Sequence, residues 1–295
     1  MTFEQLRIFA AVAEREHVTR AAEALNLTQS AASSAISALE QQFGLKLFHR
    51  VGRNITLTEA GRCFFDEAKA ILARVHSAEA AMAEFSGMAR GRLTIHASQT
   101  IASYFLPDWL VRFHARFPGI ELSVAVGNTA QVARAVVQGD AELGFVEGPV
   151  SHPQLVAELV GTDQMIVVVS PGHPWAGKTS LSPAMLAEAS WVLREDGSGT
   201  RAVFTEALHA LGVAPEDLRT AIALPSNEAV RAAVEGGAGP AALSSLVCAE
   251  SLAAGRLVKV GVKLPGREFN AVQHVERYRS RAVTELLKLI REGKA

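Results

Sequence analysis

The sequence predicts an α/β protein: a small three-helix unit, then a long helix, then a two-lobed α/β domain. Three patterns indicate this fold class. Two short amphipathic helices are expected within residues 19–43, an apolar repeat of 3.5 residues runs along 59–88, and apolar runs alternate with helical stretches beyond residue 91. Such alternation is typical of βαβ units whose parallel sheets are covered by helices on both faces.

Length and composition suit a chain with about two domains. The 295 residues are 49% apolar and carry a net charge of −1, and a domain usually takes roughly 150 residues. Residues 1–58 hold six Arg or Lys against five acidic residues. Bulk charge therefore does not predict nucleic-acid binding, and any such contact must depend on the placement of individual groups.

The sequence carries no membrane or metal signal. We find no apolar run of about 18 residues and no secretory signal, so a cytoplasmic protein with no membrane partner is expected. Cys63 and Cys248 lie far apart and match no metal-ligand spacing. We expect two reduced thiols, with a redox-sensing disulfide as the alternative.

The pattern of residues 19–43 predicts two helices joined by a turn at Asn26 and Leu27. Thr28 supplies a hydroxyl suited to capping the second helix. One face of that helix is an apolar stripe, which predicts a buried side. The stripe consists of Ala32, Ala35, Ile36, Leu39 and Phe43.

The opposite face of this second helix carries small polar side chains. Hydroxyls and one amide let a helix lie deep in a groove and form hydrogen bonds with base edges and phosphates. DNA binding is therefore the first hypothesis, and an ordinary amphipathic surface pair is the alternative. The candidate contacts on this helix are Thr28, Gln29, Ser30, Ser33, Ser34 and Ser37.

Flanking segments extend the pair into a winged helix-turn-helix over residues 1–58. An amphipathic helix is expected at 3–17, Gly44 is suited to ending the second helix of the pair, and extended runs at 45–49 and 54–57 form a wing. Arg50 and Arg53 in the wing are placed to meet phosphate or a minor groove.

A long helix is expected from Thr58 to about residue 88, within a linker segment of 59–90 that ends in a glycine-containing hinge. A sustained 3.5-residue repeat predicts a coiled coil and hence a dimer. The alternative is a helix packed on its own domain. The repeat consists of Gly61, Phe64, Ala68, Ile71, Val75, Ala78, Met82 and Phe85.

Residues 91–295 are expected to form two α/β lobes with a cleft between them. The predicted strands are 92–97, 121–126, 143–146, 165–170, 191–193, 221–224, 257–260 and 269–275. The predicted helices are 101–117, 129–138, 200–211, 226–234 and 280–291.

The continuous run from Met1 to Gly61 resembles the N-terminal domain of LysR-type transcriptional regulators. Many members carry a basic residue where this chain has Ser34, which shifts the expected phosphate contacts to Arg50, Arg53 and the helix termini. The resemblance implies a DNA-binding, effector-responsive regulator that acts as a dimer or tetramer at dyad-symmetric promoter DNA. It also makes RNA polymerase a candidate partner.

Residues 91–295 resemble the effector-binding domain of that family, which looks like a periplasmic binding protein. By that resemblance the chain crosses between lobes near 161–164 and 265–270. Lobe I would comprise 92–161 and 270–295, and lobe II 162–269. Closure of the lobes around a small-molecule effector would then be the switch.

Effector contacts are expected where strands end and helices begin, because helix N-termini there direct N–H groups inward. The Gly-Ser-Gly-Thr-Arg segment at 197–201 combines close backbone approach, hydroxyls and a charge, which suits a small anion. Ordinary helix caps are the alternative. The candidate residues are Ser98, Gln99, Thr100, Asn128, Thr129, Glu147, Ser198, Gly199, Thr200, Arg201 and Asn227.

Segments 127–129, 147–148 and 197–201 look like the branch of the family that regulates sulfur assimilation and CO₂ fixation. That resemblance implies a small oxyanion or anionic metabolite as effector. Separately, the sequence leads us to expect no cofactor and no metal.

Motifs that carry catalysis are missing from the sequence. There is no H-E-x-x-H and no G-x-S-x-G, and the glycine-rich stretch at 236–239 lacks the lysine of a phosphate loop. We therefore predict a regulator without catalytic residues. The rival hypothesis is an anion-binding or enzymatic α/β protein whose N-terminal unit serves only for dimerisation.

Overall fold

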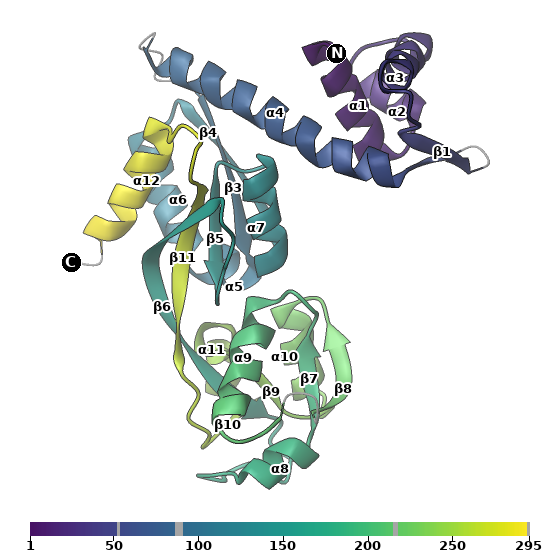
Figure 1. The fold of residues 1–295 in the computed structure, drawn as a ribbon. Helices are drawn as coiled ribbons and strands as arrows, with labels where there is room; N and C mark the ends of the chain where they lie inside the picture. Colours follow the sequence, from purple (N-terminus) through teal and green to yellow (C-terminus); the bar gives the residue numbers. More distant parts are fainter. Residues whose placement is uncertain (52–53, 86–90, 215–217, 294–295) are drawn as a thin grey trace. The chain divides into compact units, whose positions relative to one another are not determined.

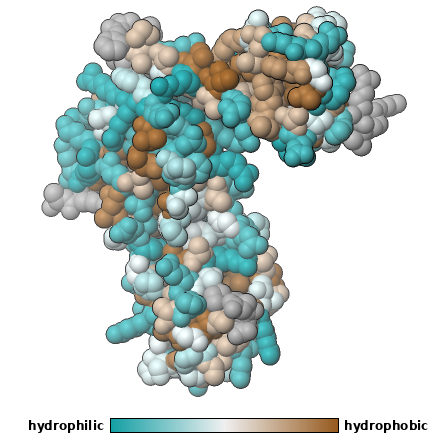
Figure 2. Space-filling view, viewed as in Figure 1, coloured by the Kyte–Doolittle hydropathy of each residue, from teal (hydrophilic) through white to brown (hydrophobic). Residues whose placement is uncertain are grey.

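The computed structural model describes residues 1–51, 54–85, 91–214 and 218–293 (Figure 1). The chain folds as two units that divide near residue 86. Among the described residues, no helix has the length and apolarity needed to cross a membrane. The face seen in Figure 2 mixes hydrophilic and hydrophobic residues.

The first unit is a three-helix bundle with a two-stranded wing and a long C-terminal helix. Its elements are α1 (Phe3–Arg15), α2 (Val18–Ala24), α3 (Gln29–Phe43), β1 (Phe48–Val51), β2 (Asn54–Leu57) and α4 (Glu59–Phe85). A capping box between Thr2 and Gln5 starts α1, and Gly44 ends α3 in the left-handed conformation with φ 65°. The predicted winged helix-turn-helix is therefore present.

The core of the first unit joins α1, α2, α3 and the start of α4. Phe9, Val12 and Leu39 are fully buried, and the Phe9 ring contacts the rings of Phe48 and Phe64. Phe43 differs from the predicted buried stripe, because it lies in the last turn of α3 and remains 46% exposed.

The apolar repeat of α4 divides into two parts. Gly61 and Ala68 are buried in the core of their own unit, so the coiled-coil prediction is wrong for this first part. There is no room for a side chain at position 61, because a Cβ there would lie 2.0 Å from the Leu47 carbonyl oxygen. Farther along, Ile71 and Met82 are 39% and 63% exposed. The side chain of Phe85 and the hinge at 86–90 lie outside the described residues.

The second unit contains both lobes. In lobe I, strands β4, β3 and β5 are parallel, and β11 pairs antiparallel with β5. Helices α5, α6 and α12 cover one face of this sheet and α7 covers the other. The elements are β3 (Gly91–Ser98), α5 (Gln99–Tyr104), α6 (Leu106–Arg116), β4 (Ile120–Gly127), α7 (Thr129–Gln138), β5 (Leu143–Glu147), β11 (Gly266–His274) and α12 (Arg281–Glu292).

Lobe II packs around the fully buried Trp191, whose ring contacts Trp175 and Phe204. Its elements are α8 (Pro183–Glu188), β7 (Ser190–Arg194), α9 (Gly199–Ala210), β8 (Arg219–Leu224), α10 (Asn227–Glu235), β9 (Ala241–Ser244), α11 (Ser245–Ala253) and β10 (Val258–Val260). The sequence patterns did not predict α8, β9 or α11.

Two strands run through both lobes. Strand β6 (Leu155–Val169) pairs with β11 in lobe I and with β9 and β10 in lobe II, and its pairing with β11 shifts register between Phe269 and Asn270. The sheet is therefore mixed, not parallel as predicted, and β6 begins ten residues before the predicted strand at 165–170. The predicted helix 101–117 is also interrupted. Helix α5 ends at Tyr104, and after Phe105 helix α6 starts with Pro107 in its first turn.

Candidate DNA-reading head and effector site

Helix α3 presents a polar face opposite its buried stripe. Thr28 caps the helix, since its Oγ1 accepts from the Ala31 N–H at 3.2 Å. The other predicted contacts lie on the outer turns and are exposed or half-buried: Gln29, Ser30, Ser33, Ser34 and Ser37. Gln29 Nε2 donates to Ser33 Oγ at 3.2 Å. The face thus offers hydroxyl and amide groups and no charged side chain.

Glu40 fixes the start of the wing to α3. Its carboxylate accepts from the Leu47 N–H at 2.9 Å and from Lys46 Nζ at 2.5 Å. Burial would raise the pKa of Glu40, but these bonds and that to the Phe48 N–H outweigh it, so the pKa is lowered. The side chain of Arg50 and all of Arg53 lie outside the described residues.

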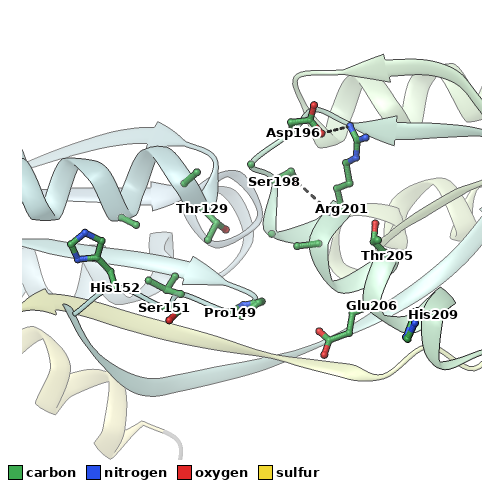
Figure 3. Close-up of a pocket in the computed structure, with 16 residues that line it drawn as sticks. Thr129, Pro149, Ser151, His152, Asp196, Ser198, Arg201, Thr205, Glu206 and His209 are labelled. Carbon is green, nitrogen blue, oxygen red and sulfur yellow. Dashed lines mark hydrogen bonds and ion pairs between the residues drawn. The ribbon is translucent and has the colours of Figure 1, made fainter. Parts of the chain in front are cut away.

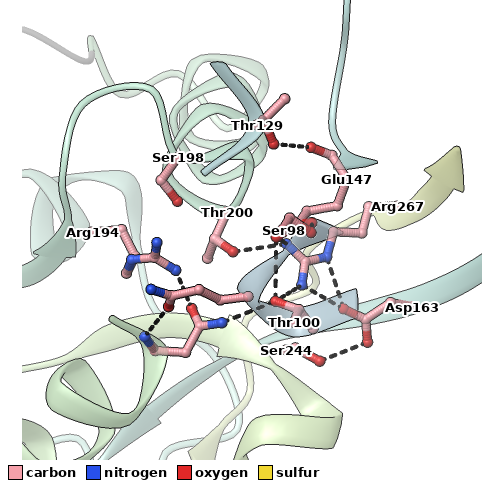
Figure 4. A network of polar contacts seen from close by, with 12 residues as sticks. Ser98, Thr100, Thr129, Glu147, Asp163, Arg194, Ser198, Thr200, Ser244 and Arg267 are labelled. Atoms are coloured by element: carbon pink, nitrogen blue, oxygen red, sulfur yellow. Dashed lines mark hydrogen bonds and ion pairs between the residues drawn. The ribbon is translucent and has the colours of Figure 1, made fainter. Parts of the chain in front are cut away.

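A buried ionic cluster joins the lobes in the second unit (Figure 4). Arg267 on β11 donates through Nε to Asp163 Oδ2 at 2.8 Å, and its Nη1 lies 3.6 Å from Glu147 Oε1. All three side chains are at most 3% exposed. One guanidinium thus lies between two carboxylates, with Asp163 on β6 and Glu147 at the end of β5.

Hydroxyl groups from both lobes surround this cluster. Arg267 donates to Thr200 Oγ1 at 2.9 Å and to Thr100 Oγ1 at 3.2 Å. The Ser98 and Thr100 hydroxyls donate to the Glu147 carboxylate, Thr100 over 3.3 Å. Ser244 Oγ donates to Asp163 at 2.9 Å. Among the described residues, every buried side-chain N or O atom has a hydrogen-bond partner.

A second arginine extends the cluster into lobe II. Arg194, 4% exposed, donates to Asn227 Oδ1 at 2.6 Å and forms two bonds to the Glu195 carboxylate at 2.7 and 2.9 Å. Burial would raise the pKa of Glu195, but Arg194 and the Asn128 amide lower it overall. Asn128, from lobe I, donates to Glu195 at 3.2 Å, which adds a bond between the lobes.

An open pocket of about 720 Å³ lies beside this cluster, between α7, the 149–152 segment and α9 (Figure 3). Arg201 and Glu206 of α9 both line it. Arg201 pairs with Asp196 at 2.9 Å and donates to the Arg194 carbonyl oxygen at 3.2 Å. Its guanidinium is thus held by neighbouring groups of lobe II.

Two family models match this chain. Residues 3–62 match the bacterial regulatory helix-turn-helix protein, lysR family, and residues 86–295 match the LysR substrate binding domain. The chain belongs to the LysR family of transcriptional regulators. The predicted fold class, DNA-binding regulatory function and absence of enzymatic activity are confirmed by these matches and by the names of the relatives below.

Relatives of this LysR-type regulator span most of its length. The uncharacterized HTH-type transcriptional regulator YeiE of Escherichia coli K12 is 35% identical over 97% of this chain and 96% of its own length. The RuBisCO operon transcriptional regulator of Allochromatium vinosum is 34% identical, with 89% and 86% covered. The predicted resemblance to the branch that includes regulators of CO₂ fixation is thereby confirmed.

Solved structures of LysR-type regulators share the fold. A full-length OxyR variant from Pseudomonas aeruginosa aligns with a TM-score of 0.72 and 22% identity, covering 99% of this chain and 95% of that one. The regulatory domain of Synechocystis PCC6803 CcmR in complex with 2-PG aligns with a TM-score of 0.63 and 27% identity, covering 69% and 97%.

The LysR-type fold brings many of the predicted effector residues together. Ser98, Thr100, Glu147, Thr200 and Asn227 meet in the cluster. The remaining predicted residues lie around it. Gln99 forms hydrogen bonds with Pro225 and Asn227 across the lobes, and Asn128 donates to Glu195. Thr129 donates to the Glu147 carbonyl, which Gly199 also contacts, and Ser198 caps α9 close to Arg201.

Sequence reasoning missed the charged centre of this site. Arg267, Asp163, Arg194 and Ser244 were not among the predicted residues. One signal was available, because Asp163 and Arg267 fall within the two predicted crossings at 161–164 and 265–270 and carry opposite charges. Arg194, followed directly by two acids, gave no sign that its side chain is buried.

Proposed function

We propose that this LysR-type regulator binds a small anionic effector at the cluster between its lobes and reads dyad-symmetric DNA as a homodimer through α3 and the wing. The observation that carries the effector proposal is the convergence of donors on one carboxylate. Hydroxyls of Ser98 and Thr100 donate to Glu147, and the Arg267 guanidinium lies 3.6 Å from it. An anion with oxygens in that place meets the same donors.

The positions of the donors on different lobes link anion binding to closure. Thr100 belongs to lobe I, Thr200 to lobe II, and Arg267 to the strand that joins them. A ligand held by all three favours the closed arrangement, as population shift requires. The CcmR regulatory domain, solved in complex with 2-PG, supports a small ligand in this type of domain.

The polar face of α3 supports DNA reading by hydroxyl and amide contacts. A neutral helix gains little from phosphate attraction, so two copies at fixed spacing are needed for tight binding. The exposed Ile71 and Met82 on α4 offer an apolar surface that a second copy would bury. The rival hypothesis of an N-terminal dimerisation module is not supported, because residues 3–62 match a regulatory helix-turn-helix.

A gel-shift titration with the DNA upstream of the chain's own gene tests the DNA proposal. Ser33→Ala and Ser34→Ala are expected to lower affinity for the dyad site more than for random DNA, since each removes a hydroxyl facing the groove. Thr220→Ala, on the exposed β8, is the matched control. Equal losses on both DNAs would contradict reading by α3.

Thermal unfolding of the full chain with small oxyanions tests the effector proposal. The wild type is expected to be stabilised by at least one anion, and Thr100→Ala is expected to lose most of that stabilisation. Thr220→Ala should keep it. If no oxyanion raises the melting temperature, the effector is not a small oxyanion.

A further inference from the structure

The Glu147 side chain fills the place that the proposed anion would take (Figure 4). It is 2% exposed. The Ser98 hydroxyl donates to one of its carboxylate oxygens and the Thr100 hydroxyl to the other, while Arg267 Nη1 lies 3.6 Å away. Glu147 lines neither the 720 Å³ pocket nor a second pocket of about 690 Å³ beside it. The donors that an external anion would need are thus already used by a carboxylate of the chain itself.

The backbone of Glu147 is fixed from several sides. Strand β5 pairs with β11 at this point, where Glu147 stands opposite Phe269. The Thr129 hydroxyl donates to the Glu147 carbonyl oxygen at 2.9 Å, and Gly199 of lobe II packs against the same carbonyl. The carboxylate can therefore leave the site by rotation about its own side-chain bonds, while the strand stays in place.

Among the residues described for this cluster, three carboxylates face two guanidinium groups. Arg267 lies between Asp163 and Glu147, and all three side chains are at most 3% exposed. Arg194 is paired with Glu195. A further anion beside Glu147 would bring a second uncompensated negative charge into a poorly solvated site, where like charges repel strongly. An anionic effector and the Glu147 carboxylate therefore exclude each other.

We propose that Glu147 is the resident occupant of the effector site, a tethered carboxylate that an incoming anion has to displace. The inference rests on the proposed anion site and adds a regulatory role for Glu147 within it. A tethered group competes at a high effective concentration. The apparent affinity for an anion is then reduced by the small fraction of molecules in which the carboxylate has left the site. Glu147 thereby sets the anion concentration to which the regulator responds.

Vacating the site provides the test. Glu147→Ala removes the Cγ atom and the carboxylate, which together have the size of acetate. Calorimetric titration of the full chain at constant ionic strength is expected to show that acetate and sulfate each bind this variant at least about 10-fold more tightly than the wild type. Acetate should also raise the melting temperature of the variant more than that of the wild type. The control Glu206→Ala removes the same charge from the open pocket, where Glu206 is exposed, and should bind both anions as the wild type does.

The outcomes separate this inference from the proposed function. If wild type and Glu147→Ala bind sulfate equally well, Glu147 is not a competitor, and the anion site stands without it. If neither protein binds acetate or sulfate, both the inference and a site for small anions at this cluster are overturned. Glu147→Gln keeps the shape of the side chain and removes its charge, so it should bind sulfate more tightly than the wild type and less tightly than Glu147→Ala. If Glu147→Ala fails to fold, an unchanged sulfate affinity in Glu147→Gln would overturn the inference.

Discussion

Gly199 of α9 lies so close to Glu147 of β5 that a Cβ on Gly199 would stand 2.0 Å from the Glu147 carbonyl oxygen and 2.5 Å from Thr129 Oγ1. The two lobes therefore meet backbone to backbone at this point. The Thr129 hydroxyl completes the contact by donating to the same carbonyl at 2.9 Å. A side chain at position 199 is therefore incompatible with this contact between the lobes.

Gly199→Ala is expected to hinder closure and so to weaken anion binding. The overpacked contact should cost about 1–3 kcal/mol, or roughly 5- to 150-fold in affinity. Calorimetric titration with the best-binding anion measures this loss. Gly172→Ala is the matched control, because a Cβ at Gly172 meets nothing within 4 Å. Equal affinity in both variants would mean that the anion does not require this contact.

Arg267→Met is expected to destabilise the second unit strongly. The change leaves Asp163 and Glu147 buried without their cation, and breaking one partner of a buried ion pair costs about 3–5 kcal/mol. Urea unfolding of the full chain measures the loss in free energy of unfolding. The double variant Arg267→Met with Asp163→Asn should recover part of it, since one uncompensated charge is removed. No recovery would indicate that lost packing causes the destabilisation.

Gly61→Ala is expected to destabilise the first unit by about 1–3 kcal/mol. The added methyl would lie 2.0 Å from the Leu47 carbonyl oxygen and 3.0 Å from Leu57 Cδ2, at the junction of wing and α4. Hydrogen exchange of core amides in α1 and α3 reports the change. Unaltered protection would contradict the tight contact between α4 and the wing.

Glu40→Gln is expected to change the acid sensitivity of the wing. The pKa of Glu40 is lower in the folded chain than the roughly 4.3 of a free glutamate, so its contribution to stability is present above that value and is lost as the pH falls through the folded pKa. Exchange protection of the Leu47 amide should therefore fall with acidification in the wild type. In Glu40→Gln, exchange protection of the Leu47 amide should be lower at neutral pH and should change less on acidification. The control Glu79→Gln should show the same protection and the same pH dependence as the wild type.

Local patterns in the sequence were sufficient to predict the elements that form from short-range signals. The caps at Thr28 and Gly44, the wing and the polar face of α3 depend on residues a few positions apart. The alternation of strands and helices likewise placed α7, α9 and α12 to within a residue or two. These features need no knowledge of distant contacts.

Features that depend on tertiary pairing were not predictable in this way. The charged centre unites Asp163 with Arg267, which are 104 positions apart, and no local pattern signals that both are buried. The antiparallel course of β6 and β11 depends on pairing across a similar separation. The repeat in α4 led to a wrong coiled-coil prediction for its first part. An apolar stripe does not specify whether Ala68 packs on its own unit or on a second copy of the chain.

The two cysteines differ in burial, so their reactivity can report on the opening of lobe II. Both are free thiols; Cys63 is exposed, while Cys248 is buried in lobe II and burial raises its pKa to about 12. A thiolate-directed reagent at neutral pH should therefore modify only Cys63 in the folded protein. Labelling of Cys248 then requires α11 to leave the core, so its rate follows the opening of lobe II without any introduced probe.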